Sequence, residues 1–405
     1  MAKYFLKCAD CDHREPETEY RIVCPKCKGF LEVAFESVPA EPLDRSQPSI
    51  FKFHRVMPYE ATPDVLDYEH FEPTPIVPAG PLSERLGIDL YFKDETLMPS
   101  GTWKDREGYV SAHRLLINHV KDLVIFSSGN TATSLARSIS IIRGPRLHIV
   151  LPEASRDRIQ TYAQFFDPEF VKVHYFAGSN DECIVAARKL AQEQGYTIEG
   201  GFSNYARREG LKLLGLEVAT LWDRRPDWYV QPVAGGIGVY SFYKAYADLG
   251  RAAECPRILG VQAEICPPMV NAWRDNSSKL EQRHVPQTVI PSDFVRVLRT
   301  REPADSYPVV KKVTDKVNGA FEAVNDQEIY EALRAFYREP YYLDHYQRTG
   351  MLIGLEPATA LAGVIKSVKV GTIEKGSSVL LNVSGAAKRG DIRAEWLADL
   401  LPLRH

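Results

Sequence analysis

The sequence predicts an α/β protein with two α/β domains built on parallel-rich sheets, plus a small zinc ribbon at the N-terminus. The first reason is that short apolar strands alternate with helical patterns from about residue 89 onward, which is typical of parallel sheets covered on both faces. The second reason is a pair of Cys-x2-Cys motifs near the N-terminus, because four thiols at this spacing suit a tetrahedral metal site.

Length and composition narrow the class of protein. The 405 residues are enough for two or three domains and a large buried core. A net charge of −3 and ordinary apolar content indicate neither disorder nor nucleic-acid binding. No apolar run approaches the roughly 20 residues of a membrane span, and Met1–Lys7 lacks the apolar core of a signal peptide. We therefore expect a cytoplasmic protein, with Cys183, Cys255 and Cys266 as buried, inert thiols.

Residues 1–36 form the expected ribbon, with apolar strand candidates at 4–6 and 30–35. The four expected ligands of a structural zinc ion are Cys8, Cys11, Cys24 and Cys27. The metal would replace a core too small to fold alone and would leave no open position for catalysis. Two disulfides are an alternative, which the lack of a secretion signal disfavours. Binding of RNA or a partner is another, although neither a basic run nor exposed aromatic residues accompany the pairs.

The rest of the chain is expected to alternate between strands and helices after a Pro- and Glu-rich connecting arm at 37–80. Expected strands are short apolar runs bounded by turn residues, and expected helices show apolar periodicity. The strands span residues 89–93, 123–126, 147–151, 171–175, 228–231, 258–262 and 378–383. The helices span residues 109–117, 131–142, 156–166, 181–194, 208–221, 239–249, 326–338 and 357–368. The proline-containing section 275–325 is expected to be less regular.

The chain is organised around the stretch Met98–Arg106, in which Lys104 follows a strand and a Pro-Gly turn and precedes a helix. Backbone on both sides holds a lysine at such a junction, beside the partial positive charge of a helix N-terminus. That environment, with Arg106 nearby, can favour a neutral, nucleophilic amine that forms a Schiff base. The alternative is a solvated lysine near a helix start, since lysine is mostly exposed in proteins.

A first turn of small polar residues lies directly between a strand and a helix. Its residues are Ser127, Ser128, Gly129, Asn130 and Thr131. Backbone amides and small hydroxyls at a helix N-terminus form an anion cradle suited to a carboxylate or a phosphate. The alternative is an ordinary capped turn, because Ser, Asn and Thr are common N-cap residues.

A second turn between a strand and a helix carries three glycines. Its residues are Ala234, Gly235, Gly236, Ile237 and Gly238. Glycine lets the backbone approach a phosphate closely. A dinucleotide fold is the alternative, because Glu264 ends the next strand and could hold a ribose. Against it, Ser241 stands where a G-x-G-x-x-G motif has its third glycine, and about 230 residues precede the turn.

The last expected strand leads to Ser384. A serine at the carboxyl end of a strand points into the crevice where α/β sheets bind ligands. Without further context, a strand terminator before a turn explains this residue equally well.

A nucleophilic lysine, a carboxylate loop, a glycine phosphate loop and a late serine together match one cofactor, pyridoxal 5'-phosphate. The chain resembles the fold-type II pyridoxal-phosphate enzymes, which are tryptophan synthase β-like in fold, and within them the threonine synthase family. The residues that carry the resemblance are Lys93–Thr96, Pro99–Arg106, Ser128–Thr131, Val261–Glu264 and Glu356–Ala358. Cys-x2-Cys pairs also occur in some threonine synthases.

The resemblance implies a role for each candidate residue. Lys104 would hold the cofactor covalently and act as the general base once it is freed. The cofactor would also contact Asn130 through its ring hydroxyl, Ser384 through its pyridine nitrogen, and Ala234, Gly235, Gly236, Ile237 and Gly238 through its phosphate. The substrate carboxylate would bind Ser127, Ser128, Gly129 and Thr131, and a substrate phosphate would meet Lys93 and Arg207. A neutral hydroxyl at the pyridine nitrogen favours expulsion of a leaving group over racemisation or transamination.

Several positions depart from the threonine synthase pattern around the lysine. Met98 replaces an Asn, Trp103 a Phe and Glu107 a Gly. The segments Asn204–Gly210, Asn271–Trp273 and Leu380–Gly385 look more like cysteate synthase, a relative that replaces the phosphate of phosphoserine with sulfite. We therefore expect elimination and replacement on an O-phosphorylated amino acid, with β-replacement first and γ-elimination with hydration to threonine second. The non-enzymatic alternative is a zinc-ribbon ligand sensor, against which the retained site residues argue.

The resemblance also implies an organisation of the chain. The ribbon would be followed by a large cofactor-binding domain at 37–110 and 200–405, with a smaller α/β domain at 111–199 between its parts. The expected partners are a small amino acid and a small nucleophile, with neither nucleic acid nor membrane. We expect a homodimer.

Overall fold

The structure, a computed structural model, describes residues 4–59, 72–127, 129–160, 166–178, 180–287 and 298–401. The chain divides into two compact units. The first comprises Met1–Pro73, Met98–Thr220 and Lys244–Ala252, and the second comprises Thr74–Leu97, Leu221–Tyr243 and Ala253–His405. The domain boundaries expected from the sequence stay a prediction.

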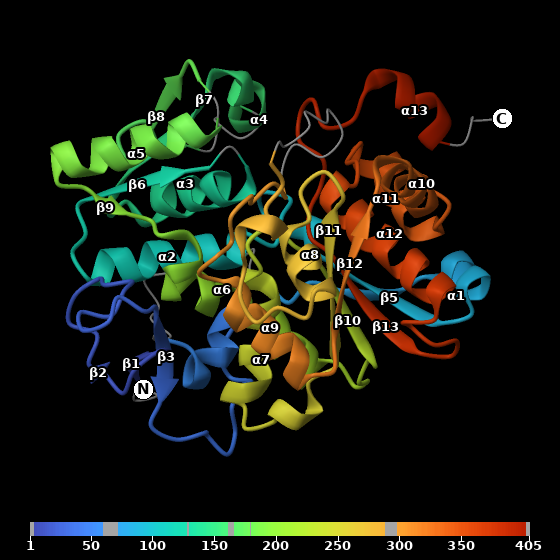
Figure 1. Cartoon of the computed structure of the whole chain (residues 1–405), viewed down its shortest axis with the longest axis horizontal. Coiled ribbons are helices and arrows are strands. Elements are labelled where there is room, and N and C mark those ends of the chain that lie inside the picture. Colours follow the sequence, from blue (N-terminus) through green and yellow to red (C-terminus); the bar gives the residue numbers. More distant parts are fainter. Residues whose placement is uncertain are drawn as a thin grey trace. The chain divides into compact units, whose positions relative to one another are not determined.

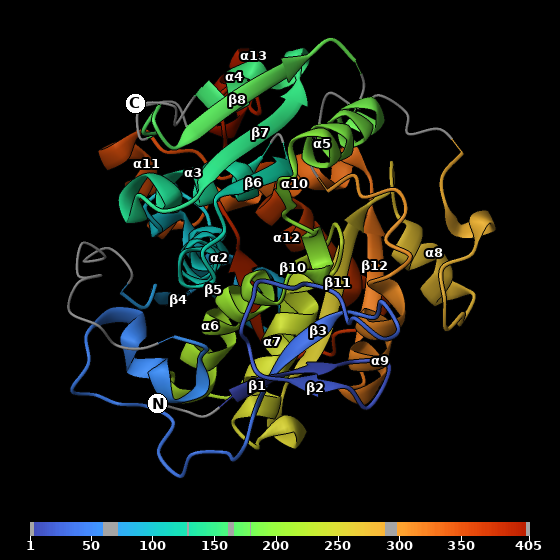
Figure 2. The same cartoon turned by 90° about the vertical axis from the view of Figure 1, so that its left-hand side faces the viewer.

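The first unit begins with a three-stranded antiparallel sheet, whose strands lie before, between and after the two cysteine-containing turns (Figure 2). Its strands, in the spatial order β2-β1-β3, are β1 (Tyr4–Cys8), β2 (Arg14–Glu15) and β3 (Leu31–Phe35). Because Cys8 pairs with Leu31 at the end of the β1–β3 ladder, both cysteine pairs are held near that end. Both expected ribbon strands are confirmed. The arm after them contains the short 3-10 helix η1 (Ser49–Val56).

The remainder of the first unit is a parallel sheet in the order β8-β7-β6-β9, with helices on both faces. The strands are β6 (Asp122–Phe126), β7 (Arg146–Pro152), β8 (Val171–Phe176) and β9 (Thr197–Ile198). The helices are α2 (Asp105–Ile117), α3 (Asn130–Ile142), α4 (Arg156–Gln160), α5 (Asn180–Gln194) and α6 (Tyr205–Leu221). Alternation along β6 places Leu123 and Ile125 in the core with α2 and α3, and Val124 in the core with α5. The apolar runs of these strands therefore cover both faces, as a parallel sheet requires.

The second unit is a six-stranded sheet in the order β12-β11-β10-β13-β5-β4, in which β4 alone of the described strands runs antiparallel. The other strands of this sheet are labelled in Figure 1. The strands are β4 (Ile76–Pro78), β5 (Asp89–Asp94), β10 (Trp228–Pro232), β11 (Arg257–Ala263), β12 (Ala320–Val324) and β13 (Ser378–Val383). The helices of this unit are α1 (Gly80–Leu86), the first part of α7 (Ile237–Asp248), α8 (Pro268–Arg274), α9 (Tyr307–Lys316), α10 (Asp326–Phe336), α11 (Pro340–Thr349), α12 (Leu355–Val370) and α13 (Ala394–Leu400). The apolar helix α12 packs on the central strands β10 and β11 and forms much of the core.

The expected strands and helices are present in the described residues, with some corrections. The section 275–325 is more regular than expected, because it contains α9 and β12. Its prolines do not prevent the helix, since Pro308 lies in the first turn of α9, where the missing N–H costs nothing. The expected helix at 156–166 is described as far as Gln160, and residues 161–165 lie outside the described part. No described helix is long and apolar enough to cross a membrane.

Candidate active site

Lys104 is held at the start of α2 by a turn whose polar groups bond to one another. Gly101 adopts a positive φ of 70°, and its N–H donates to the Met98 carbonyl over 2.7 Å. The Asp105 carboxylate accepts from both the N–H and the hydroxyl of Ser100, each over 2.6 Å. The Ser134 hydroxyl of α3 donates to the Lys104 carbonyl over 2.6 Å. The backbone at Lys104 is thus bonded on both sides.

Two glycines let neighbouring helices approach this lysine closely. A Cβ on Gly108 of α2 would lie 2.8 Å from the backbone carbonyl of Ser134 in α3. A Cβ on Gly210 of α6 would lie 2.3 Å from the Arg106 carbonyl oxygen and 2.6 Å from the Glu107 Cα. Any side chain at either position would push the helices apart. The close approach brings residues at the N-terminal ends of α3 and α6 to the first turn of α2.

Five polar side chains of the first unit meet there, and we call them the lysine cluster. They are Lys104, Glu107, Thr131, Glu199 and Arg207. The Lys104 ammonium lies 3.3 Å from Glu107 Oε2, and the Thr131 hydroxyl donates to Glu107 Oε1 over 2.7 Å. Arg207 donates to both oxygens of Glu107 over 3.2 Å, to Glu199 over 3.1 Å and to Thr131 over 3.2 Å. The cluster therefore joins three residues predicted from the sequence through two carboxylates that were not predicted.

Burial and charge act against each other in this cluster. Burial lowers the pKa of Lys104, and Arg207 lowers it further, whereas the attraction of Glu107 opposes the change. Burial raises the pKa of Glu107, but Arg207 and Lys104 outweigh it and hold the carboxyl below its usual pKa. Although burial disfavours its charge, Arg207 has a raised pKa because of Glu107 and Glu199. At neutral pH Glu107 is therefore ionised and Arg207 is charged.

The N-terminus of α6 is arranged so that Arg207 and Glu199 meet. Asn204 caps the helix, because its side-chain oxygen accepts from the N–H groups of Ala206, over 3.0 Å, and Arg207, over 3.3 Å. The Asn204 amide donates to Glu199 over 3.0 Å. One residue thus orients both members of this ion pair.

The small-polar turn lies at the N-terminus of α3, as predicted, and offers an unused acceptor. Asn130 begins the helix, and its side-chain oxygen is buried and accepts no hydrogen bond from the residues that the structure describes. Such an orphaned acceptor fits a ligand that brings a hydroxyl donor, such as the ring hydroxyl of pyridoxal phosphate. Ser127 and Gly129 are half-buried beside it, and Ser128 lies outside the described residues.

In the second unit, the glycine turn and Ser384 follow neighbouring strands. β10 leads into the turn and β13 leads to Ser384, and the two strands pair in parallel. Gly236 has a φ of 77°, and a Cβ there would lie 2.6 Å from Val310. Around Gly235, by contrast, an added Cβ would meet nothing within 4 Å. The turn therefore presents open backbone at the N-terminus of α7, which suits a phosphate group. Ser384 itself is buried, with 4% of its surface exposed.

Lys93 lies on β5, which pairs with β13 on the side opposite β10. Its ammonium contacts Thr74 and Glu95 of the same unit. It donates to the Thr74 carbonyl oxygen over 2.6 Å and to the Thr74 hydroxyl. Glu95 lies 3.6 Å away and is fully buried, as is the lysine. The role of Lys93 toward a substrate phosphate stays a prediction.

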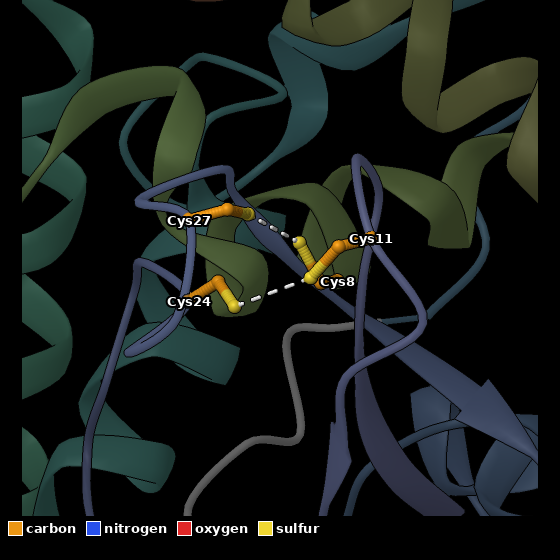
Figure 3. Close-up of side chains that lie close together, drawn as sticks. All are labelled: Cys8, Cys11, Cys24 and Cys27. Atoms are coloured by element: carbon orange, nitrogen blue, oxygen red, sulfur yellow. Dashed lines mark hydrogen bonds between the residues drawn. The ribbon is translucent and has the colours of Figure 1, made fainter.

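The four N-terminal cysteines converge from two hairpin turns (Figure 3). Their sulfur atoms all lie within 4.8 Å of one another, with Cys8 and Cys27 3.4 Å apart and Cys11 and Cys24 3.8 Å apart. These separations fit four thiolates around a zinc ion at about 2.3 Å from each sulfur, and none of the four forms a disulfide. Burial disfavours the thiolate of Cys24, but backbone N–H groups of Cys27 and Lys26 outweigh it, and its pKa falls to about 6. The donor set fits a structural zinc ion.

The fold and the site define a pyridoxal-phosphate enzyme of fold-type II. The family model for pyridoxal-phosphate dependent enzymes matches residues 68–385, and the chain belongs to that family. The chain is 28% identical to a threonine synthase of Methanosarcina acetivorans over 94% of this chain and 91% of that protein. It is 26% identical to a cysteate synthase of Methanospirillum hungatei over 95% and 90% of the two chains.

Solved structures support the fold. The processed form of threonine deaminase isoform 2 from Solanum lycopersicum superposes with a TM-score of 0.64, covering 83% of this chain and 90% of that chain at 18% identity. Maize serine racemase superposes with a TM-score of 0.61, covering 81% and 91% at 18% identity. The predicted fold class and the resemblance to threonine and cysteate synthases are confirmed.

Proposed function

We propose that the chain eliminates phosphate from an O-phosphorylated amino acid and adds a small nucleophile in its place. β-Replacement of the cysteate-synthase kind is the first candidate. The observation that supports this reaction class is Ser384, a neutral hydroxyl at the carboxyl end of β13, beside the strand that leads into the glycine turn. When bound, pyridoxal phosphate supplies an electron sink for the substrate carbon next to the amine. A neutral hydroxyl facing its ring nitrogen reduces the delocalisation of negative charge into the ring, which favours loss of a leaving group.

Residues of the chain bind the cofactor and the substrate and transfer the proton. Lys104 attaches the cofactor and then moves the proton of the substrate carbon. Asn130 orients the ring through its orphaned acceptor, and the N–H groups of the turn Ala234–Gly238 bind the cofactor phosphate. Ser127, Ser128, Gly129 and Thr131 bind the substrate carboxylate. The buried side chains of Trp103 and Glu107 lie beside the Lys104 amine and limit the access of water to it, which protects a reactive product of elimination.

Formation of threonine from phosphohomoserine is the second candidate. Its support is the similarity to the threonine synthase of Methanosarcina acetivorans over nearly the whole of both chains. Here the leaving phosphate is one carbon farther from the amine, and water is the nucleophile.

Phosphate release separates these candidates. The purified protein is incubated with phosphoserine or phosphohomoserine, each with and without sulfite, and the free phosphate and the amino-acid product are measured. The first candidate predicts phosphate and cysteate from phosphoserine only when sulfite is present. The second predicts phosphate and threonine from phosphohomoserine regardless of sulfite. Release of phosphate from neither compound would contradict the proposed function.

A substrate phosphate needs a cation, and Arg207 is the proposed one. Four of its five N–H groups donate to described residues of the cluster, so one remains for a ligand. Replacing Arg207 by alanine is expected to lower kcat/KM for the phosphorylated substrate about 10- to 100-fold, which is about 1.5–3 kcal/mol for a charge-assisted contact. Cofactor absorbance should not change. Unchanged kinetics, or an equal loss of cofactor binding, would show that Arg207 does not bind the phosphate.

A further inference from the structure

Glu107 contacts every other member of the lysine cluster except Glu199. Its Oε1 accepts from Thr131 and Arg207, and its Oε2 faces Lys104 and Arg207. Only 1% of the side chain is exposed. The threonine synthase pattern has a glycine at this position, so Glu107 departs from that pattern. A buried carboxylate carries a large desolvation cost unless it is fully paired, and Glu107 makes four contacts with three partner residues.

On the basis of the proposed function, we propose that Glu107 is a positioning residue that holds the Lys104 amine in place and stabilises its protonated form. The geometry supports this role directly. Lys104 and Glu107 stand three residues apart at the first turn of α2, so their side chains lie on the same face of the helix. Arg207 donates one N–H hydrogen bond to each oxygen of the Glu107 carboxylate, which fixes the orientation of the carboxylate.

The charges around Lys104 explain why such a residue is needed. α6 contributes the cation Arg207, the segment before it contributes Glu199, α3 contributes the neutral Thr131, and the Trp103 ring lies 4.8 Å from the ammonium. Burial and Arg207 both disfavour a positive charge on the lysine. Within the described residues, Glu107 is the carboxylate that touches the amine. It therefore keeps Lys104 basic enough to take a proton from the substrate carbon.

The test measures protonation of Lys104 directly in cofactor-free protein. An amine-selective acylating reagent is applied over a range of pH, and mass spectrometry quantifies labelling of the Lys104 peptide, because only the neutral amine reacts. Glu107→Gln removes an opposite charge beside Lys104. The labelling midpoint of this variant should therefore lie about one to three pH units below that of the wild-type protein. Glu107→Asp keeps a carboxylate and should show a smaller shift. Glu199→Gln removes a carboxylate that contacts Arg207 but not Lys104, and should also shift the midpoint less than Glu107→Gln.

An unchanged midpoint in folded Glu107→Gln, or an equal shift in Glu199→Gln, would overturn the proposal. If Glu107→Gln does not fold, the glycine variant Glu107→Gly provides the same measurement, with circular dichroism as the check on folding. Because labelling needs neither cofactor nor substrate, its result is separate from the proposed reaction. Absence of phosphate release by the wild-type protein would reject the reaction, whereas an unchanged midpoint would reject only the role of Glu107.

Discussion

Replacing Lys104 by alanine is expected to abolish turnover and the visible absorbance of covalently linked cofactor together. The lysine is the proposed attachment point and the proposed base, and loss of a general base alone costs about 10²- to 10⁴-fold in rate. Removing the covalent linkage should lower kcat further, to below detection. Absorbance spectra of the purified variant and phosphate release under saturating substrate measure the two effects. The backbone turn around position 104 should persist, because its hydrogen bonds join Ser100 to Asp105 and Gly101 to Met98.

The matched control is Lys189→Ala. Lys189 lies on α5 with 72% of its side chain exposed and pairs loosely with Glu193. It should retain both the absorbance and the activity, because surface ion pairs contribute little to stability. Full activity in Lys104→Ala would contradict the assignment of the attachment lysine.

Replacing Cys24 by serine is expected to release about one zinc ion per chain and to destabilise the ribbon. Structural zinc binds zinc-finger peptides with an apparent free energy of about 10–16 kcal/mol, and much of this is folding free energy. We expect a loss of about 4 kcal/mol or more in the free energy of unfolding of residues 4–35. Metal analysis and thermal unfolding with and without a chelator measure this. Cofactor binding should persist, because no predicted cofactor ligand lies in the ribbon.

The ribbon nevertheless contacts helices α6 and α2 of the same unit, so its loss should have a limited effect on these helices. Arg208 of α6 donates to the Leu31 carbonyl of β3, and Arg114 of α2 pairs with Glu17 over 2.9 Å. The control is Cys255→Ser, which changes a thiol outside the cluster and should retain zinc. Absence of zinc from the wild-type protein, or disulfides among the four cysteines, would exclude the metal site.

Local sequence patterns predicted much of the fold, because most of its strands are apolar runs in parallel sheets. Apolar runs such as 147–151 and 378–383 are buried on both faces of parallel sheets, and they are present as β7 and β13. The helix α9 was not predicted, because the prolines of the section 275–325 indicated irregular structure, although proline is favoured in a first helical turn. The short edge strand β12 was also not predicted. Its stability comes from pairing with β11, which no local window contains.

The site was predicted less completely, because its contacts join residues far apart in the chain. Lys104 and the turn of α3 were found from strand–turn–helix patterns. The engagement of Arg207 by Glu107, 100 residues earlier, depends on the close approach at Gly210 and has no local signal. One hint was available, since Glu107 is a departure from the family motif. Likewise, the pairing of Lys93 with Thr74 and Glu95 arises from the edge of a sheet, where β4 and β5 meet.

Borohydride reduction followed by peptide mapping tests the central claim most directly, namely that this chain is a pyridoxal-phosphate enzyme that binds its cofactor through Lys104. Reduction converts the labile linkage between cofactor and lysine into a stable one, which survives proteolysis. Mass spectrometry then locates the added cofactor mass on a peptide. We predict a single labelled peptide, modified at Lys104, and loss of visible absorbance on reduction. Labelling at a different lysine, or no labelling of protein saturated with the cofactor, would contradict the account.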